Sequence, residues 1–277
     1  MFEMFNLDFM VQAFVVSLII GLLLSYLGFH VVGRGIVFVD LALGQISSLG
    51  VAFSDYIGYG KTSIPIAFTL VGAFLMSLIR IRDIRLRLEA VIGIIYAIAS
   101  AVTVLLISKT PHGDSDIQEV LFGNILSVSW EQITTIGIVF SIIALLHFIF
   151  RNKFFALTKA FEEGESEKIK WFSLWNFLFY TSIGLAIVFA VRTSGVIPVF
   201  SYLIIPSVSA ILLFKKNVWV IIVATIISIL GGFLGLYLSF TYDFPAGSSI
   251  VAMLGVIFLV ASMAGLIRKG AKKKVIE

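Results

Sequence analysis

The sequence contains no cysteine and has few charged residues for its length. The absence of cysteine excludes disulfide bonds, thiolate metal sites and cysteine catalysis. Charged residues make up 13% of the 277 residues, against about 25% in ordinary soluble domains. Hydrophobic residues make up 60%, and the mean hydropathy is +1.09. This balance excludes a soluble globular domain and predicts an all-α polytopic membrane protein.

Motifs of several enzyme classes are also missing. We find no Gly-rich loop that leads into Gly-Lys-Ser/Thr, so we expect no ATP binding through a P-loop. HExxH and a Gly-x-Ser-x-Gly elbow are absent. His30 and His147 fall near predicted membrane boundaries, where we interpret them as interfacial polar residues rather than ligands. We therefore predict a transport subunit, not an enzyme, with no cofactor of its own.

Apolar runs of membrane-spanning length fill most of the chain. A crossing takes about 20 residues, and the predicted segments are 10–32, 36–57, 63–80, 90–108, 131–150, 174–192, 196–214, 217–240 and 247–267. We interpret Gly195, Pro198 and Pro206 as marks of a broken helix, whose freed backbone groups could line a cavity. The bundle then has eight or nine crossings in a single permease domain over residues 1–277.

The basic residues give a consistent orientation. With the N-terminus outside and the C-terminus inside, all but three of the 20 Lys and Arg residues fall in inner loops, as the positive-inside rule requires. The three outer residues are Lys61, Lys109 and Arg192. The net charge of +4 is therefore explained by the orientation of the chain in a membrane and does not indicate nucleic-acid binding.

Two connecting loops are long enough to carry a function. The outer loop after residue 108 places His112 near Asp114 and Asp116, and imidazole with carboxylates can bind a divalent cation; a flexible polar loop is the commoner explanation of this composition. The inner loop, 151–173, predicts short helices of mixed charge that suit docking of a soluble partner. The alternative for the inner loop is a solvated linker.

Small residues recur at helical spacing in two of the segments. Gly231 and Gly235 form a GxxxG pair, and Ala97 and Ala101 repeat the spacing. Both pairs predict close helix packing and name no function.

The second segment carries an ionisable residue within an apolar run. On a helical wheel, Asp40 shares one side with small and polar residues that include Gly44 and Ser47, while Leu43 and Ile46 lie opposite and are expected to face apolar surroundings. An acid in a membrane helix usually faces a cavity or a partner, so Asp40 is a candidate for the transport pathway. The alternative is that Asp40 caps the start of the helix or pairs with Arg34.

Five stretches, taken together in this order and spacing, resemble the ABC-3 permease family, the membrane subunits of zinc, manganese and iron ABC importers. The stretches are Arg34–Gly44 (RGIVFVDLALG), Leu121–Ser129 (LFGNILSVS), Trp175–Tyr180 (WNFLFY), Val191–Pro206 (VRTSGVIPVFSYLIIP) and Phe244–Ile250 (FPAGSSI). The resemblance covers nearly the whole chain. Each stretch alone is a weak signal, and the five in order are a strong one.

The resemblance implies a bacterial-type cytoplasmic membrane protein that works with partners. These are a second permease copy, a cytoplasmic ABC ATPase and an extracytoplasmic metal-binding protein. It also implies that the family's Phe-Asp-x-Glu coupling sequence corresponds to Phe161, Glu162, Glu163 and Gly164, which keep the acidic character.

The chain departs from the family at the metal pathway. The family's second span commonly carries Gly-Asp-Ala-Leu-Ser-His. Aligned from Arg34, the Asp and His positions fall on Asp40 and Gly44; aligned back from Gly50, they fall on Leu41 and Gln45. Both alignments lack the histidine, so the resemblance implies a pathway of Asp40, Gly44, Gln45 and Ser47 that offers carboxylate without imidazole.

The leading hypothesis is thus an ATP-driven importer permease for a divalent metal ion (zinc, manganese or iron). A permease for a metal chelate is the alternative within the same family. A stand-alone secondary transporter or a membrane enzyme is the alternative from another class.

Overall fold

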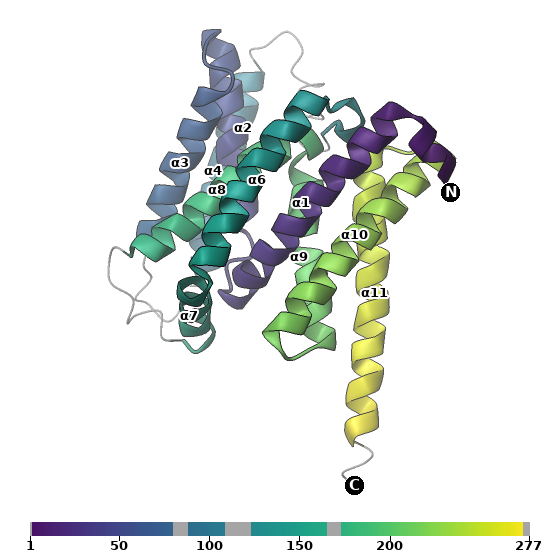
Figure 1. Ribbon diagram of the computed structural model, residues 1–277. Coiled ribbons are helices and arrows are strands. Elements are labelled where there is room, and N and C mark those ends of the chain that lie inside the picture. Colours follow the sequence, from purple (N-terminus) through teal and green to yellow (C-terminus); the bar gives the residue numbers. More distant parts are fainter. Residues whose placement is uncertain (1, 80–87, 109–122, 165–172, 274–277) are drawn as a thin grey trace. The chain divides into compact units, whose positions relative to one another are not determined.

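The computed structural model describes residues 2–79, 88–108, 123–164 and 173–273, and these residues form helices joined by short connections (Figure 1). The 3₁₀ helices are η1 (Phe2–Asn6) and η2 (Ile125–Ser127). The α-helices are α1 (Asp8–Gly33), α2 (Val39–Ile57), α3 (Ser63–Leu78), α4 (Leu88–Ile107), α6 (Trp130–Ile149), α7 (Arg151–Glu162), α8 (Leu174–Ser194), α9 (Val196–Leu213), α10 (Asn217–Tyr242) and α11 (Ala246–Lys273).

Each of the nine predicted segments coincides with one of these helices. Local signals explain several ends: the Ser173 side chain accepts a hydrogen bond from Asn176 N–H at the start of α8, and Gly58 adopts the left-handed conformation that ends α2. Within the described residues, seven helices are long and apolar enough to cross a membrane: α1, α4, α6, α8, α9, α10 and α11. The prediction of an all-α, multi-pass membrane protein is therefore confirmed.

The described helices group into two compact units, and each is considered by itself. The first, here the α10–α11 unit, comprises Met1–Phe29, Asn124–Thr134 and Ile197–Glu277. The second, here the α2–α8 unit, comprises His30–Gly123 and Thr135–Val196. The prediction of a single permease domain is not tested by this grouping.

In the α2–α8 unit, α2 packs against α3, α4 and α8. Glycines bring the helices close: a Cβ on Gly50 would lie 2.7 Å from Pro65 Cα, and one on Gly184 would lie 3.1 Å from Thr69 Cγ2. Leu43 is fully buried. The placement of Leu43 opposite Asp40 was wrong, because residues three apart share one face of a helix, and that face of α2 is covered by neighbouring helices, whereas Ile46 is half-buried.

In the α10–α11 unit, the predicted GxxxG pair does form a helix contact. Gly231 lies against Leu254 and Gly235 against Ile250, so α10 and α11 approach closely along this face. Ala97 and Ala101 behave differently, because both are exposed on α4.

Helix α9 is continuous through Pro206, so the predicted broken helix was wrong. Pro198 lies in the first turn of α9, where backbone N–H groups have no intrahelical partner. Pro206 removes one hydrogen bond from the interior, and contacts with α1 brace this turn: Ser207 Oγ donates to the Ser25 carbonyl at 2.9 Å. The helical run is interrupted instead at Gly195 (φ 80°), where α8 ends and before α9 begins.

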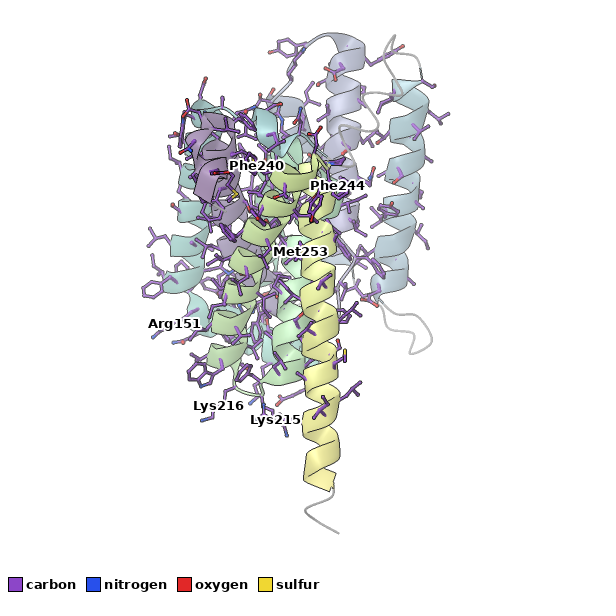
Figure 2. All side chains as sticks on the ribbon, turned by 90° about the vertical axis from the view of Figure 1, so that its right-hand side faces the viewer. Arg151, Lys215, Lys216, Phe240, Phe244 and Met253 are labelled. Carbon is purple, nitrogen blue, oxygen red and sulfur yellow. The ribbon has the colours of Figure 1, made fainter. Side chains whose placement is uncertain are left out.

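Basic residues gather at one end of the α10–α11 unit. Lys215 and Lys216 lie at the end of α10 near the C-terminal part of α11, and Phe240 and Phe244 lie at the opposite end (Figure 2). Arg268 donates to the Leu213 carbonyl at 2.7 Å, at the basic end. The connection that contains Lys215 and Lys216 and the C-terminal end of α11 therefore lie on one side, as the alternating topology predicts. Which side of the membrane this is stays a prediction.

Large apolar side chains remain exposed on α4 and α6. Ile98 and Leu105 on α4, and Ile142 and Leu145 on α6, are each more than half exposed. Such surfaces are unfavourable in water and are solvated by lipid tails in a bilayer.

Replacement of Gly28 by alanine is expected to destabilise the α10–α11 unit, because the added Cβ would lie 1.7 Å from the Leu203 carbonyl oxygen, which is backbone and cannot rotate away. Overpacking of this kind costs about 1–3 kcal/mol or more. We expect a lower Tm of the purified protein in detergent. Gly255→Ala is the matched control, because nothing lies within 4 Å of its added Cβ; equal Tm values for the two variants would contradict the packing of α1 on α9.

Candidate functional site

Asp40 is the second residue of α2 and is almost fully buried, with 2% of its surface exposed. The connection from α1 reaches α2 through Gly35, whose φ of 64° suits glycine. One Asp40 carboxylate oxygen accepts a hydrogen bond from the Leu41 N–H at 2.8 Å. This bond satisfies one N–H of the first turn, although the N-cap residue itself is Phe38 and makes no side-chain cap hydrogen bond. The burial is what the pathway hypothesis requires.

The predicted pathway residues of α2 lie on buried faces of the α2–α8 unit. A Cβ on Gly44 would lie 3.7–3.8 Å from Ile187, Val191 and Val196. Gln45 and Ser47 are 6% and 1% exposed. Asp40, Gly44 and Ser47 therefore lie on one side of α2, here called the seam, and Gly44 opposes α8 at ordinary van der Waals distance. Gln45, five residues after Asp40, lies on a different buried side of the helix.

Arg34 turns toward α7 and α8. Its Nε donates to Thr158 Oγ1 at 3.2 Å, and its Nη1 donates to Asn176 Oδ1 at 3.2 Å. The guanidinium carbon lies 3.4 Å from the centre of the Phe179 ring, a cation–π contact. His30 Nδ1 lies 2.8 Å from the same Thr158 hydroxyl. Arg34 is thus buried between three helices, at 5% exposure.

The interpretation of His30 and His147 as interfacial residues was wrong. They are 0% and 1% exposed, and the His147 ring stacks on Phe154 at 4.0 Å between centroids. A sequence signal was available on α7, where Phe154 and Thr158 are four residues apart and so share one helix face. Sequence reasoning assigned no role to Thr158 or Asn176.

The predicted coupling residues lie at the end of α7, within the predicted docking loop. The ring of Phe161 is half-buried, 5.6 Å from the Arg34 guanidinium carbon. Glu162, Glu163 and Gly164 are exposed. Partial burial, and then the charge of Glu163, raise the pKa of the Glu162 carboxyl. The rest of the predicted loop, residues 165–172, lies outside the described residues.

The possible outer metal-capture residues, His112, Asp114 and Asp116, also lie outside the described residues. Among the residues that the structure does describe, no three His, Cys, Asp or Glu side chains gather as a metal site.

The segment Gly60–Thr62 reads Gly-Lys-Thr, the last three positions of a P-loop. Asp55 occupies the position of the motif's first glycine. The segment joins α2 to α3, whereas a P-loop follows a strand. Arg192 on α8 donates to the Lys61 carbonyl at 3.1 Å, so this loop is tied to the helix bundle.

Comparison with known proteins covers nearly the whole chain. The chain is 29% identical over 270 residues to a probable iron transport system membrane protein of Haemophilus influenzae, covering 94% of this chain and 91% of that protein. It is 28% identical over 262 residues to the manganese transport system membrane protein MntC of Listeria monocytogenes, covering 92% and 90%.

A solved structure shares the fold. PsaBC from Streptococcus pneumoniae, in complex with Fab, superposes with a TM-score of 0.78 at 24% identity, covering 94% of each chain. The family model described as the ABC 3 transport family matches residues 6–265. A match over so much of the chain, together with the membrane-spanning helices, confirms the predicted resemblance: the chain belongs to the ABC 3 transport family.

Proposed function

We propose that the chain is the membrane permease subunit of an ATP-driven importer of a divalent metal ion, manganese or ferrous iron. The observation that carries the proposal is the buried carboxylate of Asp40 on the small-residue seam of α2, in a chain that matches a transport family over residues 6–265. A buried carboxylate in a membrane helix is unfavourable unless a cation or another partner balances it.

The chemistry of the available side chains narrows the choice of metal ion. Carboxylate, carbonyl and water oxygens suit manganese, whereas imidazole suits zinc, copper, iron and nickel, so the ligand chemistry favours manganese over iron. The buried polar residues of α2 include Asp40, Gln45 and Ser47, whose side chains can bind a cation through oxygen. Two relatives are named for iron and manganese transport. In a dimer of permeases, the two Asp40 carboxylates would double the charge along the pathway.

Two partners supply what this chain lacks. A cytoplasmic ATPase would dock on the exposed face of α7, which carries Lys159, Glu162 and Glu163. An extracytoplasmic binding protein would deliver the ion to the outer side. ATP binding and hydrolysis in the partner would then switch the permease dimer between outward- and inward-open states.

A metal chelate is the second candidate, since one relative is named as a chelated iron transport system membrane protein, YfeC of Yersinia pestis. The seam argues for the free ion. Ile187, Val191 and Val196 lie within van der Waals distance of a Cβ at Gly44, so a bulky ligand would pass Gly44 only if α8 moved away from α2.

The proposal is tested by purifying the tagged chain from its native membrane in mild detergent and in nanodiscs, and by measuring manganese uptake. Co-purification of an ATPase in stoichiometric amount, with ATP-dependent manganese uptake by the reconstituted complex, is expected. Uptake without any ATPase would support a secondary transporter instead. Competition by metal chelates, but not by free manganese, would favour the chelate permease.

A further inference from the structure

A buried polar cluster joins α7 to three helices of the α2–α8 unit. It consists of His30, Arg34, Thr158, Asn176 and Ser77, here called the inner-end cluster. These residues come from the end of α1, the connection after it, α7, α8 and α3, and all belong to one compact unit.

The Thr158 hydroxyl connects two basic side chains. Arg34 is always protonated and can only donate, so Thr158 Oγ1 accepts from its Nε, at 3.2 Å. The hydroxyl hydrogen remains available for His30 Nδ1, 2.8 Å away. One oxygen on α7 therefore holds the last turn of α1 and the residue that follows α1.

Arg34 extends the connection to α8 and α3. Its Nη1 donates to Asn176 Oδ1 at 3.2 Å, and Asn176 Nδ2 donates to the Ser77 carbonyl at 3.4 Å. A displacement of Thr158 is therefore passed by hydrogen bonds to three other helices.

The surroundings of the cluster are aromatic and apolar. Phe154 stacks on His147, and Phe179 lies under the Arg34 guanidinium. Stacking and cation–π contacts tolerate a wider range of geometries than hydrogen bonds do, so they restrain the rotation of a helix less tightly. The directional bonds of Thr158 fix the rotational setting of α7.

The approach of α1 to α7 is close enough to transmit movement. A Cβ on Gly33 would lie 2.8 Å from Thr158 Cγ2 and 2.6 Å from Glu162 Oε1. From Arg34, a short connection leads to α2, where Val37 N–H donates to Glu89 of α4 at 3.2 Å. Asp40 follows three residues later, so only the short connection after Arg34, whose end is tied to α4 by this bond, separates Arg34 from the start of α2.

We propose that Thr158 is a positioning residue that couples movement of α7, through its hydrogen bonds to Arg34 and His30, to the start of α2 and the Asp40 carboxylate. This inference rests on the proposed function, because it assumes that an ATPase moves α7. The inference concerns how the docking surface on α7 is linked to the transport pathway. Thr158 itself does not contact the pathway residues of α2.

The test replaces Thr158 by valine, which keeps the branched shape and removes the hydroxyl. The purified complex with its ATPase is reconstituted in liposomes, and manganese imported per ATP hydrolysed is measured. We expect this ratio to fall at least tenfold, while the ATPase still co-purifies with the permease. Thr158→Ser restores the hydroxyl and is expected to restore most of the ratio, an outcome that a purely packing role of the methyl group would not produce.

The matched control is Thr103→Val. Thr103 is a buried threonine of α4 whose hydroxyl donates to the Ala99 carbonyl of its own helix at 2.8 Å, so its loss should leave the ratio unchanged. A normal ratio in Thr158→Val, in a complex whose unaltered form is coupled, would overturn the proposal.

A second variant covers the case in which Thr158→Val does not accumulate. Arg34→Lys keeps the charge, but lysine lacks the planar fork that reaches Thr158 and Asn176 together. The same fall in ratio is expected, and an unchanged ratio would overturn the proposal. If the unaltered chain co-purifies with no ATPase at all, the proposed function itself fails, which separates the two failures.

Discussion

Replacement of Asp40 by asparagine is expected to reduce manganese uptake by roughly tenfold to 100-fold. Asparagine keeps the shape of the side chain and still accepts the hydrogen bond from Leu41 N–H, but it carries no charge. A hydrogen bond to a charged group contributes about 1.5–3 kcal/mol, and each 1.4 kcal/mol corresponds to about tenfold in an equilibrium constant. The loss should appear as reduced uptake by the reconstituted complex at low manganese concentration.

The capping alternative makes a different prediction for the same residue. Asparagine is a good residue at helix N-termini and alanine is a poor one. If Asp40 only stabilises the start of α2, Asp40→Asn should keep both uptake and Tm, whereas Asp40→Ala should lower the Tm. Retention of uptake by the asparagine variant would therefore remove Asp40 from the pathway.

The control for Asp40 is Ser48→Ala. Ser48 is buried on the same helix, and its hydroxyl donates to the Gly44 carbonyl at 3.0 Å. This bond lies within α2, so its removal should leave uptake near the level of the unaltered protein. An equal loss in both variants would indicate a general disturbance of α2.

Reversal of charge at Glu162 and Glu163 together is expected to abolish binding of the partner ATPase. Both side chains are exposed at the end of α7. Glu163 makes an exposed ion pair with Lys159 at 3.6 Å, and such pairs contribute about 0–1 kcal/mol, so the helix should survive the change. Like-charge contacts across an interface cost several kcal/mol, which corresponds to about 100-fold or more in affinity.

The measurement is the amount of ATPase that co-purifies with the Glu162→Lys/Glu163→Lys variant. Asp55→Lys is the matched control, because it also replaces an exposed acid by lysine, but near the C-terminal end of α2 and away from α7 in the sequence. Equal recovery of ATPase with the double variant and with the control would show that the partner does not bind this part of α7.

Asp40 could be recognised as a candidate from the sequence, but the residues around it could not. Asp40 stands out in the sequence because an acid is rare in an apolar run. That Gly44 opposes α8, and that Leu43 is buried, depends on which helices cover α2. A helical wheel gives the angle of each residue around the axis and does not say which angles meet protein and which meet lipid.

The inner-end cluster shows the same limit. Arg34 was expected either to mark an inner loop or to pair with Asp40, six residues away. Its hydrogen-bond partners Thr158 and Asn176 are 124 and 142 residues distant in the chain. Contacts at such separations are set by the packing of α1, α7 and α8, and a short sequence pattern cannot specify them.

The sequence by itself determined the membrane class, the approximate positions of nine helices and the family. These properties depend on composition, on the length of apolar runs and on local end signals, all of which act within one segment. Only the tertiary structure decided that His30 and His147 are buried, that α9 continues through Pro206 and that one threonine on α7 holds Arg34. Each of these depends on a neighbouring helix that satisfies or covers the group, because in a bilayer a polar or backbone group must find its partner within the protein.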